Sequence, residues 1–559
     1  MKNKFMKMNK FTDRYIYDKH LIYILIFLMS LMMPTIFLLY KGEMWDVSKT
    51  LIYSIETILG IVNLDLIIFN LIKRECKLEH VFLNLMIPVG CCYLVLIIPN
   101  YVYDEAAHSY RAYVISEGHI ITDRQSDNKP KMEVPKDLID SINVHTYKQL
   151  VEAINKKTDY NNLVLVGDDG VGATGYPFVC YIFSSIGMLI GRILNLNIII
   201  AYYLAKILSF ISFLILSFYT LKKLPIGKII MFVYLFNPML IHQIISISAD
   251  SLIISFCLLF VCYILNLLYN KEKLTNKKFL LLSFLTICVA MGKYVYIPLV
   301  LLLMLLTKDE TSKNKRRLLT LFISSIVLCI GLYFYVNILN PAPASLYIIE
   351  NNVDSLKQLK NVIMHPTIFF EMFYRTILQL GPYYLETFLG SSLGWLNIYV
   401  NKLIIYSYLI LLCLSPFLVK EKKYPDIKLK LSFLFITIIT SMLVIFGLYL
   451  GWTPVGALVA LGIQGRYFIP IAFMILLAFS SCRLASTCLF LFPICIKLRL
   501  YNISNVHIKK EKSINISFDF SKIMECIYYK KNTYNSNSTF INSNRFNYCF
   551  TVFSYLNFI

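Results

Sequence analysis

The chain alternates along most of its length between long apolar runs and short polar segments. A helix that crosses a membrane needs about 20 mostly apolar residues. Runs of roughly this length are Leu21 to Tyr40, Leu51 to Ile72, Val81 to Pro99, Ile198 to Thr220, Ile229 to Ile247, Leu252 to Tyr269, Leu318 to Leu339, Ile398 to Val419, Leu431 to Leu450, and Phe468 to Phe479 with its continuation. Phe279 to Leu306 predicts two shorter spans hinged at Gly292 and Lys293. Together these runs predict an all-α polytopic membrane protein with about 12 transmembrane helices.

One apolar segment, Phe178 to Leu194, does not fit this alternation. If it spanned the membrane, the basic pair Lys222 and Lys223 would fall on the outer side. Two glycines and an arginine also interrupt it. We therefore expect an interfacial or re-entrant helix here.

Basic residues mark the cytoplasmic ends of spans, and they fix the predicted orientation. Lysines and arginines are dense before the first run, and further clusters follow at 73–77, 222–228, 313–317 and 420–423. Both termini are therefore expected in the cytoplasm. Frequent Ile, Asn, Lys and Tyr are typical of an AT-rich bacterial genome, which favours a bacterial plasma membrane as the location.

This orientation divides the chain into six parts. They are an N-terminal three-span segment (1–99), an extracytoplasmic loop that forms a small cap (100–176), a membrane bundle (177–339), a second extracytoplasmic loop (340–397), C-terminal membrane spans (398–499) and a polar, poorly ordered cytoplasmic tail (500–559).

Composition and charge support the membrane class and exclude others. The chain is 57% hydrophobic and only 16% charged, which excludes a water-soluble globule. The net charge of +21 lies mostly in the predicted cytoplasmic turns and tail, so it indicates attraction to anionic lipid rather than a nucleic-acid partner. The 14 cysteines show no disulfide or zinc spacing, and none lies between residues 100 and 175.

Four polar motifs fall at the predicted outer ends of spans, where they carry candidate chemistry. They are Asp104-Glu105-x-x-His108 with Arg111; His242 followed by Ser248-Ala249-Asp250; Gly292-Lys293-Tyr294; and Gly462-Ile463-Gln464-Gly465-Arg466-Tyr467. In a helix, Asp104, His108 and Arg111 would share one face. Their common depth predicts one site assembled from distant parts of the chain.

Each motif also has a plainer interpretation. Charged residues at span ends commonly serve as interfacial anchors, and His242 is typical of a hydrogen-bonded interfacial histidine. Glu105-x-x-His108 is half of a di-iron motif, but the second half is absent from the sequence. Gly292-Lys293 lacks the glycine spacing of a nucleotide-binding loop.

Taken together, the motifs resemble a bacterial family of predicted membrane proteins, domain-of-unknown-function family 2142. The resemblance covers roughly Val81 to Ser480, and Gly462 to Pro470 carries it most specifically. The chain departs from the family pattern at Tyr103, where proline usually precedes the acidic pair. This family is similar in topology to the GT-C-type membrane glycosyltransferases, which take a sugar from a polyprenyl-phosphate carrier.

That resemblance implies a transferase of hexosyl type with a lipid-linked donor, acting on the outer membrane face toward a cell-envelope glycan or lipid acceptor. It implies catalytic roles for Asp104, as base, with Glu105 and His108. The implied substrate-binding residues are Arg111, His242, Asp250, Lys293, Gln464, Arg466 and Tyr467. Asp104 and Glu105 are also the implied ligands of a divalent cation, Mg or Mn, if the enzyme uses one.

Three alternatives stay open from the residues alone. A surface-polysaccharide polymerase or ligase would also handle polyprenyl-linked sugars outside the membrane. A lipid-linked saccharide transporter or flippase would also need charges near an aqueous path, although transporters usually place them at mid-membrane and show internal repeats. A non-catalytic scaffold of the cell envelope is the third.

Overall fold

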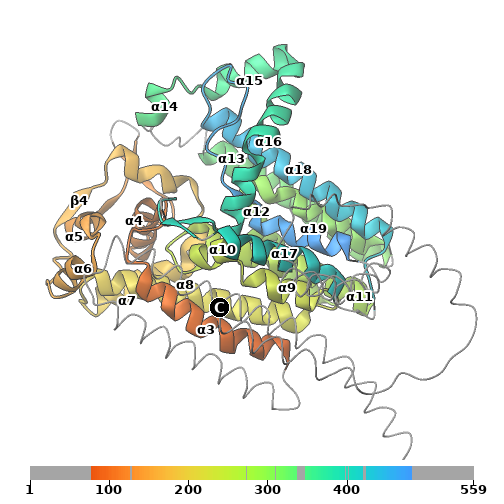
Figure 1. Cartoon of the computed structure of the whole chain (residues 1–559), viewed down its shortest axis with the longest axis horizontal. Coiled ribbons are helices and arrows are strands. Elements are labelled where there is room, and N and C mark those ends of the chain that lie inside the picture. The colour runs from red at the N-terminus through yellow and green to blue at the C-terminus, as the bar shows by residue number, and fades with distance from the viewer. Residues whose placement is uncertain are drawn as a thin grey trace, which may run out of the picture. The chain divides into compact units, whose positions relative to one another are not determined.

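The computed structural model describes residues 77–480, apart from 126–128, 272, 309, 337–345, 397, 401 and 419–422. The first two predicted spans and the predicted tail lie outside the described residues. The described part is a helical bundle with small two-stranded pairings (Figure 1).

Five helices among the described residues are long and apolar enough to cross a membrane. They are α3 (Leu78–Leu96), α8 (Ile198–Lys223), α11 (Ala249–Asn270), α13 (Ser312–Phe334) and α18 (Ile427–Gly451). Each coincides with a predicted apolar run. The membrane class is therefore confirmed, while the predicted number of about 12 spans stays a prediction.

The centre of the bundle is α11, which is buried on nearly every side. It packs against α8, α12 (Asn276–Gly292), η4 (Tyr294–Thr307) and α19 (Ile469–Phe479). α3 lies alongside α8, and α17 (Lys402–Leu418) packs on α9 (Lys228–Leu235). The outer faces of α13 and α18 expose apolar side chains such as Val327 and Phe435, as lipid-facing helices do.

One predicted span is broken in the structure. The run Ile229 to Ile247 forms two short helices, α9 and α10 (Pro238–Ile244). Pro238 has no backbone N–H to continue a helix, and the Asn237 side chain accepts a hydrogen bond from the Leu240 N–H at 3.2 Å, which caps α10. The predicted hinge at Gly292 and Lys293 is present, because α12 ends there and η4 begins at Tyr294.

The segment from Phe178 to Leu194 forms η3 (Phe178–Tyr181) and α7 (Ile182–Ile193). α7 is about 18 Å long at 1.5 Å per residue, shorter than the roughly 30 Å of a bilayer core. It packs lengthwise on α8, where Gly187 faces the backbone of Ala205 so closely that a Cβ would overlap it. The small residues thus allow close helix packing.

The cap consists of short elements after α3. They are α4 (Glu105–Ser116), β1 (Asp123–Arg124), β2 (Pro130–Lys131), β3 (Glu133–Pro135), α5 (Lys136–Asp140), η1 (Ser141–Asn143), α6 (Tyr147–Ile154), β4 (Leu163–Leu165) and η2 (Asp168–Gly175). β1 pairs with β2 and β3 with β4, both antiparallel. Met132, Val134 and Leu138 form an apolar interior without cysteines.

The second predicted loop, residues 340–397, holds far more helix than its sequence pattern suggested. It contains α14 (Leu346–Glu350), α15 (Ser355–Met364) and α16 (Pro366–Leu389), followed by the strand β5 (Ser392–Leu393), which pairs with β6 (Ile398–Tyr399). α16 packs against η6 (Gly465–Phe468), the turn that precedes α19. Gly465 permits this contact, because a Cβ there would overlap the backbone of α16 at Tyr384.

Candidate functional site

Asp104 lies at the start of α4 in an unusual backbone conformation. Its φ of 64° is in the left-handed region, which aspartate tolerates better than most residues. Its carboxylate does not cap the helix, although aspartate is a common capping residue. Instead, Oδ2 lies 3.2 Å from Nη2 of Arg466, and the side chain is 48% exposed. The turn therefore presents a paired carboxylate to solvent.

Arg466, the partner of this carboxylate, lies in η6 and is buried. Its Nη1 donates to the side-chain oxygen of Gln243 at 3.3 Å, and its Nε has no hydrogen-bond partner in the described part of the chain. The guanidinium group lies over the rings of Tyr103 and Tyr467, at 5.6 and 5.3 Å from their centroids. These contacts fix the cation while leaving it donor capacity.

A second ion pair lies beside the first. Lys293, at the end of α12, contacts Asp250, in the first turn of α11, with 2.7 Å between Nζ and Oδ1. The Asp250 N–H donates to the Ser248 side chain at 3.1 Å, which sets the start of α11. Lys293 Nζ also lies 4.9 Å from the ring centroid of Tyr467. Tyr467 therefore contacts both cations of the site.

Partial burial governs the protonation of Asp104. Desolvation raises the pKa of its carboxyl above the ordinary value, and this effect outweighs the opposing influence of Arg466 and Lys293. Asp250 raises the same pKa, so the two ion pairs are close enough to interact. A carboxylate with a raised pKa is a stronger base than a free aspartate.

Glu105 points away from Asp104. Its side chain is fully buried, with one carboxylate oxygen 3.7 Å from Lys206 Nζ on α8. The carboxylate accepts hydrogen bonds from the Ile247 N–H at 3.0 Å and the Val102 N–H at 3.3 Å. Glu105 thus ties α4 to the bundle, and in this structure it does not form a ligand pair with Asp104.

His108 and Arg111, the other predicted residues on α4, make different contacts. Nδ1 of His108 lies 2.6 Å from the hydroxyl of Tyr181, and burial lowers the pKa of His108 to about 3, so the ring stays neutral. Arg111 donates to the backbone oxygens of His119 and Ile120, at 3.2 and 2.6 Å. Arg111 therefore holds the chain after α4 rather than the acidic residues.

Two further predicted residues, His242 and Gln464, lie outside the two ion pairs. His242 Nε2 accepts a hydrogen bond from the Gly394 N–H at 3.0 Å, which joins α10 to the hairpin of β5 and β6. Gln464 is buried directly before η6. Neither position has a contact with Asp104 or Asp250 among the described interactions.

No group of three or more His, Cys, Asp or Glu side chains within the described ranges is arranged to hold a metal ion. Asp104 and Asp250 each contact a cationic side chain instead. The role of Asp104 and Glu105 as metal ligands stays a prediction.

An apolar cavity of about 320 Å³ opens next to Lys293. Its polar end is formed by Lys293, Tyr176 and Tyr467. Its remaining wall comes mostly from η4, α13 and α18, and includes Val295, Cys329, Leu332, Tyr333, Val336, Val444, Gly447 and Leu448. The cavity therefore combines a cation with apolar walls, and two of the helices that form these walls, α13 and α18, expose apolar side chains on their outer faces.

Sequence reasoning missed several residues that build the site. Lys206 is the clearest, because a single lysine inside the apolar run Ile198 to Thr220 is costly unless it is paired. Its partner, Glu105, is 101 positions away and is revealed only by the fold. Gln243 and Tyr103 gave no separate signal, whereas Tyr467, the other ring beside Arg466, belongs to the predicted set.

Fold and site define a multi-pass membrane protein with a paired-charge site at one end of its helices. No curated protein and no solved structure matches the chain. A family does: the chain belongs to the predicted membrane protein family DUF2142, which matches it over residues 88–475. The resemblance inferred from the motifs is thereby confirmed at the level of the family.

Proposed function

We propose that this protein is a membrane glycosyltransferase that moves a sugar from a polyprenyl-phosphate carrier to a cell-envelope glycan or lipid on the outer membrane face. One observation carries the proposal. A solvent-accessible carboxylate, Asp104, lies beside two cations, and one of these, Lys293, lines an apolar cavity. Transfer of a sugar from a lipid-linked phosphate uses a base for the acceptor, cations for the phosphate and an apolar space for the lipid, and these three groups occur together here.

The proposed reaction assigns each group a step. Asp104 takes the proton of the acceptor hydroxyl as that oxygen bonds to the sugar C1. The bond between C1 and the phosphate oxygen breaks, and the phosphate leaves with its polyprenyl chain. Arg466 and Lys293 stabilise the negative charge on the leaving phosphate. Arg466 would do so through Nη2, which pairs with Asp104 in this structure, since its unpartnered Nε is buried.

The cavity suits the apolar part of the carrier. It begins at Lys293 and continues along the apolar side chains of α13 and α18, whose outer faces are exposed. A chain in the surrounding lipid could enter between these helices without crossing a polar surface. The phosphate would then remain at the polar end, where Lys293 and Tyr467 lie.

The test is sugar transfer by the purified full chain, supplied with a panel of polyprenyl-phosphate hexoses and an envelope extract as acceptor. Asp104→Asn keeps the size of the side chain and removes the base, so transfer should fall by at least about 100-fold. Asp123→Asn is the matched control, because Asp123 is an exposed carboxylate of the cap that pairs with His119.

Three outcomes would count against the proposal. Wild-type rates in Asp104→Asn, with normal yield of folded protein, would remove Asp104 as the base. Failure of the wild-type protein to bind or turn over any polyprenyl-phosphate sugar would overturn the function itself. Movement of an intact lipid-linked sugar across a vesicle membrane, without transfer, would instead identify a transporter.

A further inference from the structure

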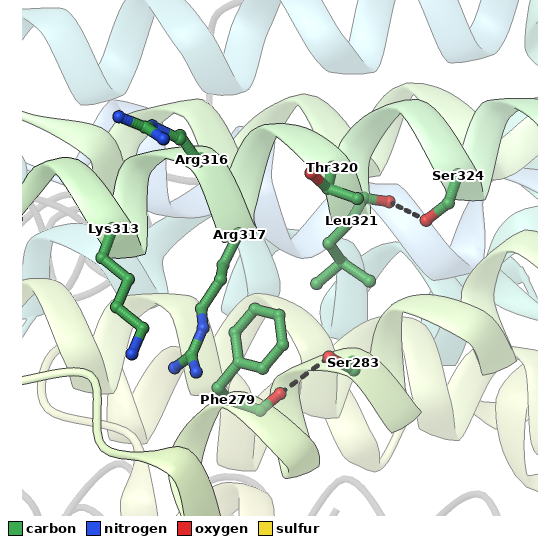
Figure 2. Close-up of a pocket in the computed structure, with 8 residues that line it drawn as sticks. All are labelled: Phe279, Ser283, Lys313, Arg316, Arg317, Thr320, Leu321 and Ser324. Atoms are coloured by element: carbon green, nitrogen blue, oxygen red, sulfur yellow. Dashed lines mark hydrogen bonds between the residues drawn. The ribbon is translucent and has the colours of Figure 1, made fainter.

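A basic groove lies between α12 and α13, at the end of these helices opposite Lys293. It has a volume of about 600 Å³. Its lining residues are Phe279, Ser283, Lys313, Arg316, Arg317, Thr320, Leu321 and Ser324 (Figure 2). α12 begins at Asn276 here and ends at Gly292 beside the candidate site, so a helix of 17 residues separates the two. The groove is thus distinct from the Asp104 site.

The α13 residues of the groove follow helical periodicity. From one turn of α13 to the next, the lining residues recur at intervals of three or four, so they share one face of the helix: positions 313, 316, 317, 320, 321 and 324. The first three are basic, and the last three are small or apolar. This face is therefore cationic at its start and uncharged toward the middle of the helix.

The three cations of the groove, Lys313, Arg316 and Arg317, form no ion pair with an acidic side chain in the part of the chain that the structure describes. Glu310, a nearby acid among the described residues, accepts hydrogen bonds from the Leu274 N–H and the Asn314 side chain. The groove therefore carries three positive charges that its own side chains do not neutralise.

Arg317 is held in place as part of the wall. Its Nη1 donates to the Asn276 side chain at 2.9 Å, and its guanidinium lies 5.6 Å from the centroid of the Phe279 ring. Figure 2 shows Lys313 and Arg317 both extending from α13 toward α12. Lys313 and Arg316 are exposed and keep their donors available.

The uncharged part of the groove continues into a lipid-facing surface. Ser324 donates to the Leu321 oxygen and Ser283 to the Phe279 oxygen, so these hydroxyls are satisfied within their own helices. Around them, α12 exposes Leu280 and α13 exposes Ile323. A molecule with an anionic head and an apolar chain matches this arrangement, in which a cationic surface is followed by an uncharged and then an apolar one.

We infer that the groove binds an anionic phospholipid, with the headgroup phosphate at Lys313, Arg316 and Arg317 and an acyl chain along Leu321 and Ser324. Clusters of basic residues at one membrane surface attract anionic headgroups, and a pocket between helices adds selectivity. This site is independent of the proposed transferase chemistry.

The test measures binding of phosphatidylglycerol to the full chain purified in detergent, with phosphatidylcholine and glycerol 3-phosphate as comparison ligands. The variant Lys313→Gln/Arg316→Gln removes two charges and leaves Arg317 and its packing intact. The control is Lys315→Gln, since Lys315 lies on the same turn of α13 but does not line the groove. Thermal unfolding of each variant without lipid reports whether it folds.

Phosphatidylglycerol should bind to wild type and to Lys315→Gln with the same affinity, and roughly 30-fold more weakly to the double variant. Equal binding of phosphatidylcholine, or wild-type affinity in a folded double variant, would overturn the proposal. Binding of glycerol 3-phosphate as tight as that of the lipid would also overturn it, because it would identify a free-phosphate site. If the double variant does not fold, equal affinity of wild type for the two phospholipids remains the decisive contrary result.

Discussion

The start of α4 separates two charged regions that contain the same kinds of groups. On one side, Glu105 and Lys206 form an ion pair in which neither side chain is exposed to solvent. On the other, Asp104 pairs with Arg466 while its carboxylate stays half exposed. Two acidic residues adjacent in sequence thus have opposite environments, and we assign them opposite roles.

The difference follows from the cost of burying charge. A fully buried pair is expensive to desolvate, and losing one partner leaves an isolated charge inside the protein. Glu105 therefore suits a fixed structural contact. Asp104 can exchange its partner at modest cost because solvent reaches it. Chemistry is expected where a charge is held but remains accessible.

The largest effect is expected from Glu105→Gln. This change leaves Lys206 buried without its carboxylate, so the free energy of unfolding should fall by about 3 to 5 kcal/mol. Denaturant titration of the purified protein in detergent measures it. The double variant Glu105→Gln/Lys206→Met removes both charges and should be less destabilised than Glu105→Gln alone.

A loss of transfer activity in Glu105→Gln without any loss of stability would contradict the structural role assigned to Glu105. In that case Glu105 would share the catalytic role assigned to Asp104. Asp104→Asn provides the reverse control: because its carboxylate is half exposed, its loss of stability should be smaller than that of Glu105→Gln, while its transfer rate falls.

A smaller effect is expected from Gly447→Phe, which tests whether the apolar chain of the donor occupies the cavity beside the accessible ion pair. Gly447 lines the apolar cavity, and a Cβ there would meet the Val295 side chain at an ordinary van der Waals distance of 3.9 Å. Excluding two methylene-sized groups of a polyprenyl chain costs about 1.6 kcal/mol, which corresponds to roughly 15-fold weaker donor binding. Donor titration measures it, and Gly331→Phe, on α13 outside the cavity, is the control. Equal affinities in both variants would place the chain elsewhere.

The smallest effect concerns pH. Because the pKa of Asp104 is raised, its base form is lost at a higher pH than for a free aspartate, and activity should fall as pH decreases through that raised value. His108, with a pKa of about 3, stays neutral and adds no transition in the range of about pH 5 to 8. The variant His108→Gln should therefore keep the wild-type midpoint in a pH-rate profile. A transition near the ordinary pKa of histidine that disappears in this variant would contradict the assignment.

Much of the fold could be predicted from hydrophobic runs alone. α8, α11 and α18 coincide with such runs, because an apolar stretch of sufficient length has few other stable forms. α16 was missed because Glu371, Arg375 and Glu386 interrupt its apolar pattern. The break at Asn237 and Pro238 was also missed, although the proline was a local signal.

The candidate site could be predicted less completely. Asp104, Asp250, Lys293 and Arg466 stood out as charges at span ends, and the structure brings them together. The sequence could not assign partners, since the pair formed by Asp104 and Arg466 joins positions 362 residues apart. Nor could it separate Asp104 from Glu105, because their difference depends on which side chain faces Lys206.

The two ion pairs of the site also have a consequence for the order of events. Their four formal charges cancel, so the unliganded site is neutral. An incoming phosphate that takes the guanidinium of Arg466 has to compete with Asp104 for it. In the proposed reaction, donor binding would thus displace the carboxylate from its partner and release the base only once a sugar is in place. Such an exchange would restrain the empty protein from activating water, and it originates in a single arginine shared between two anions.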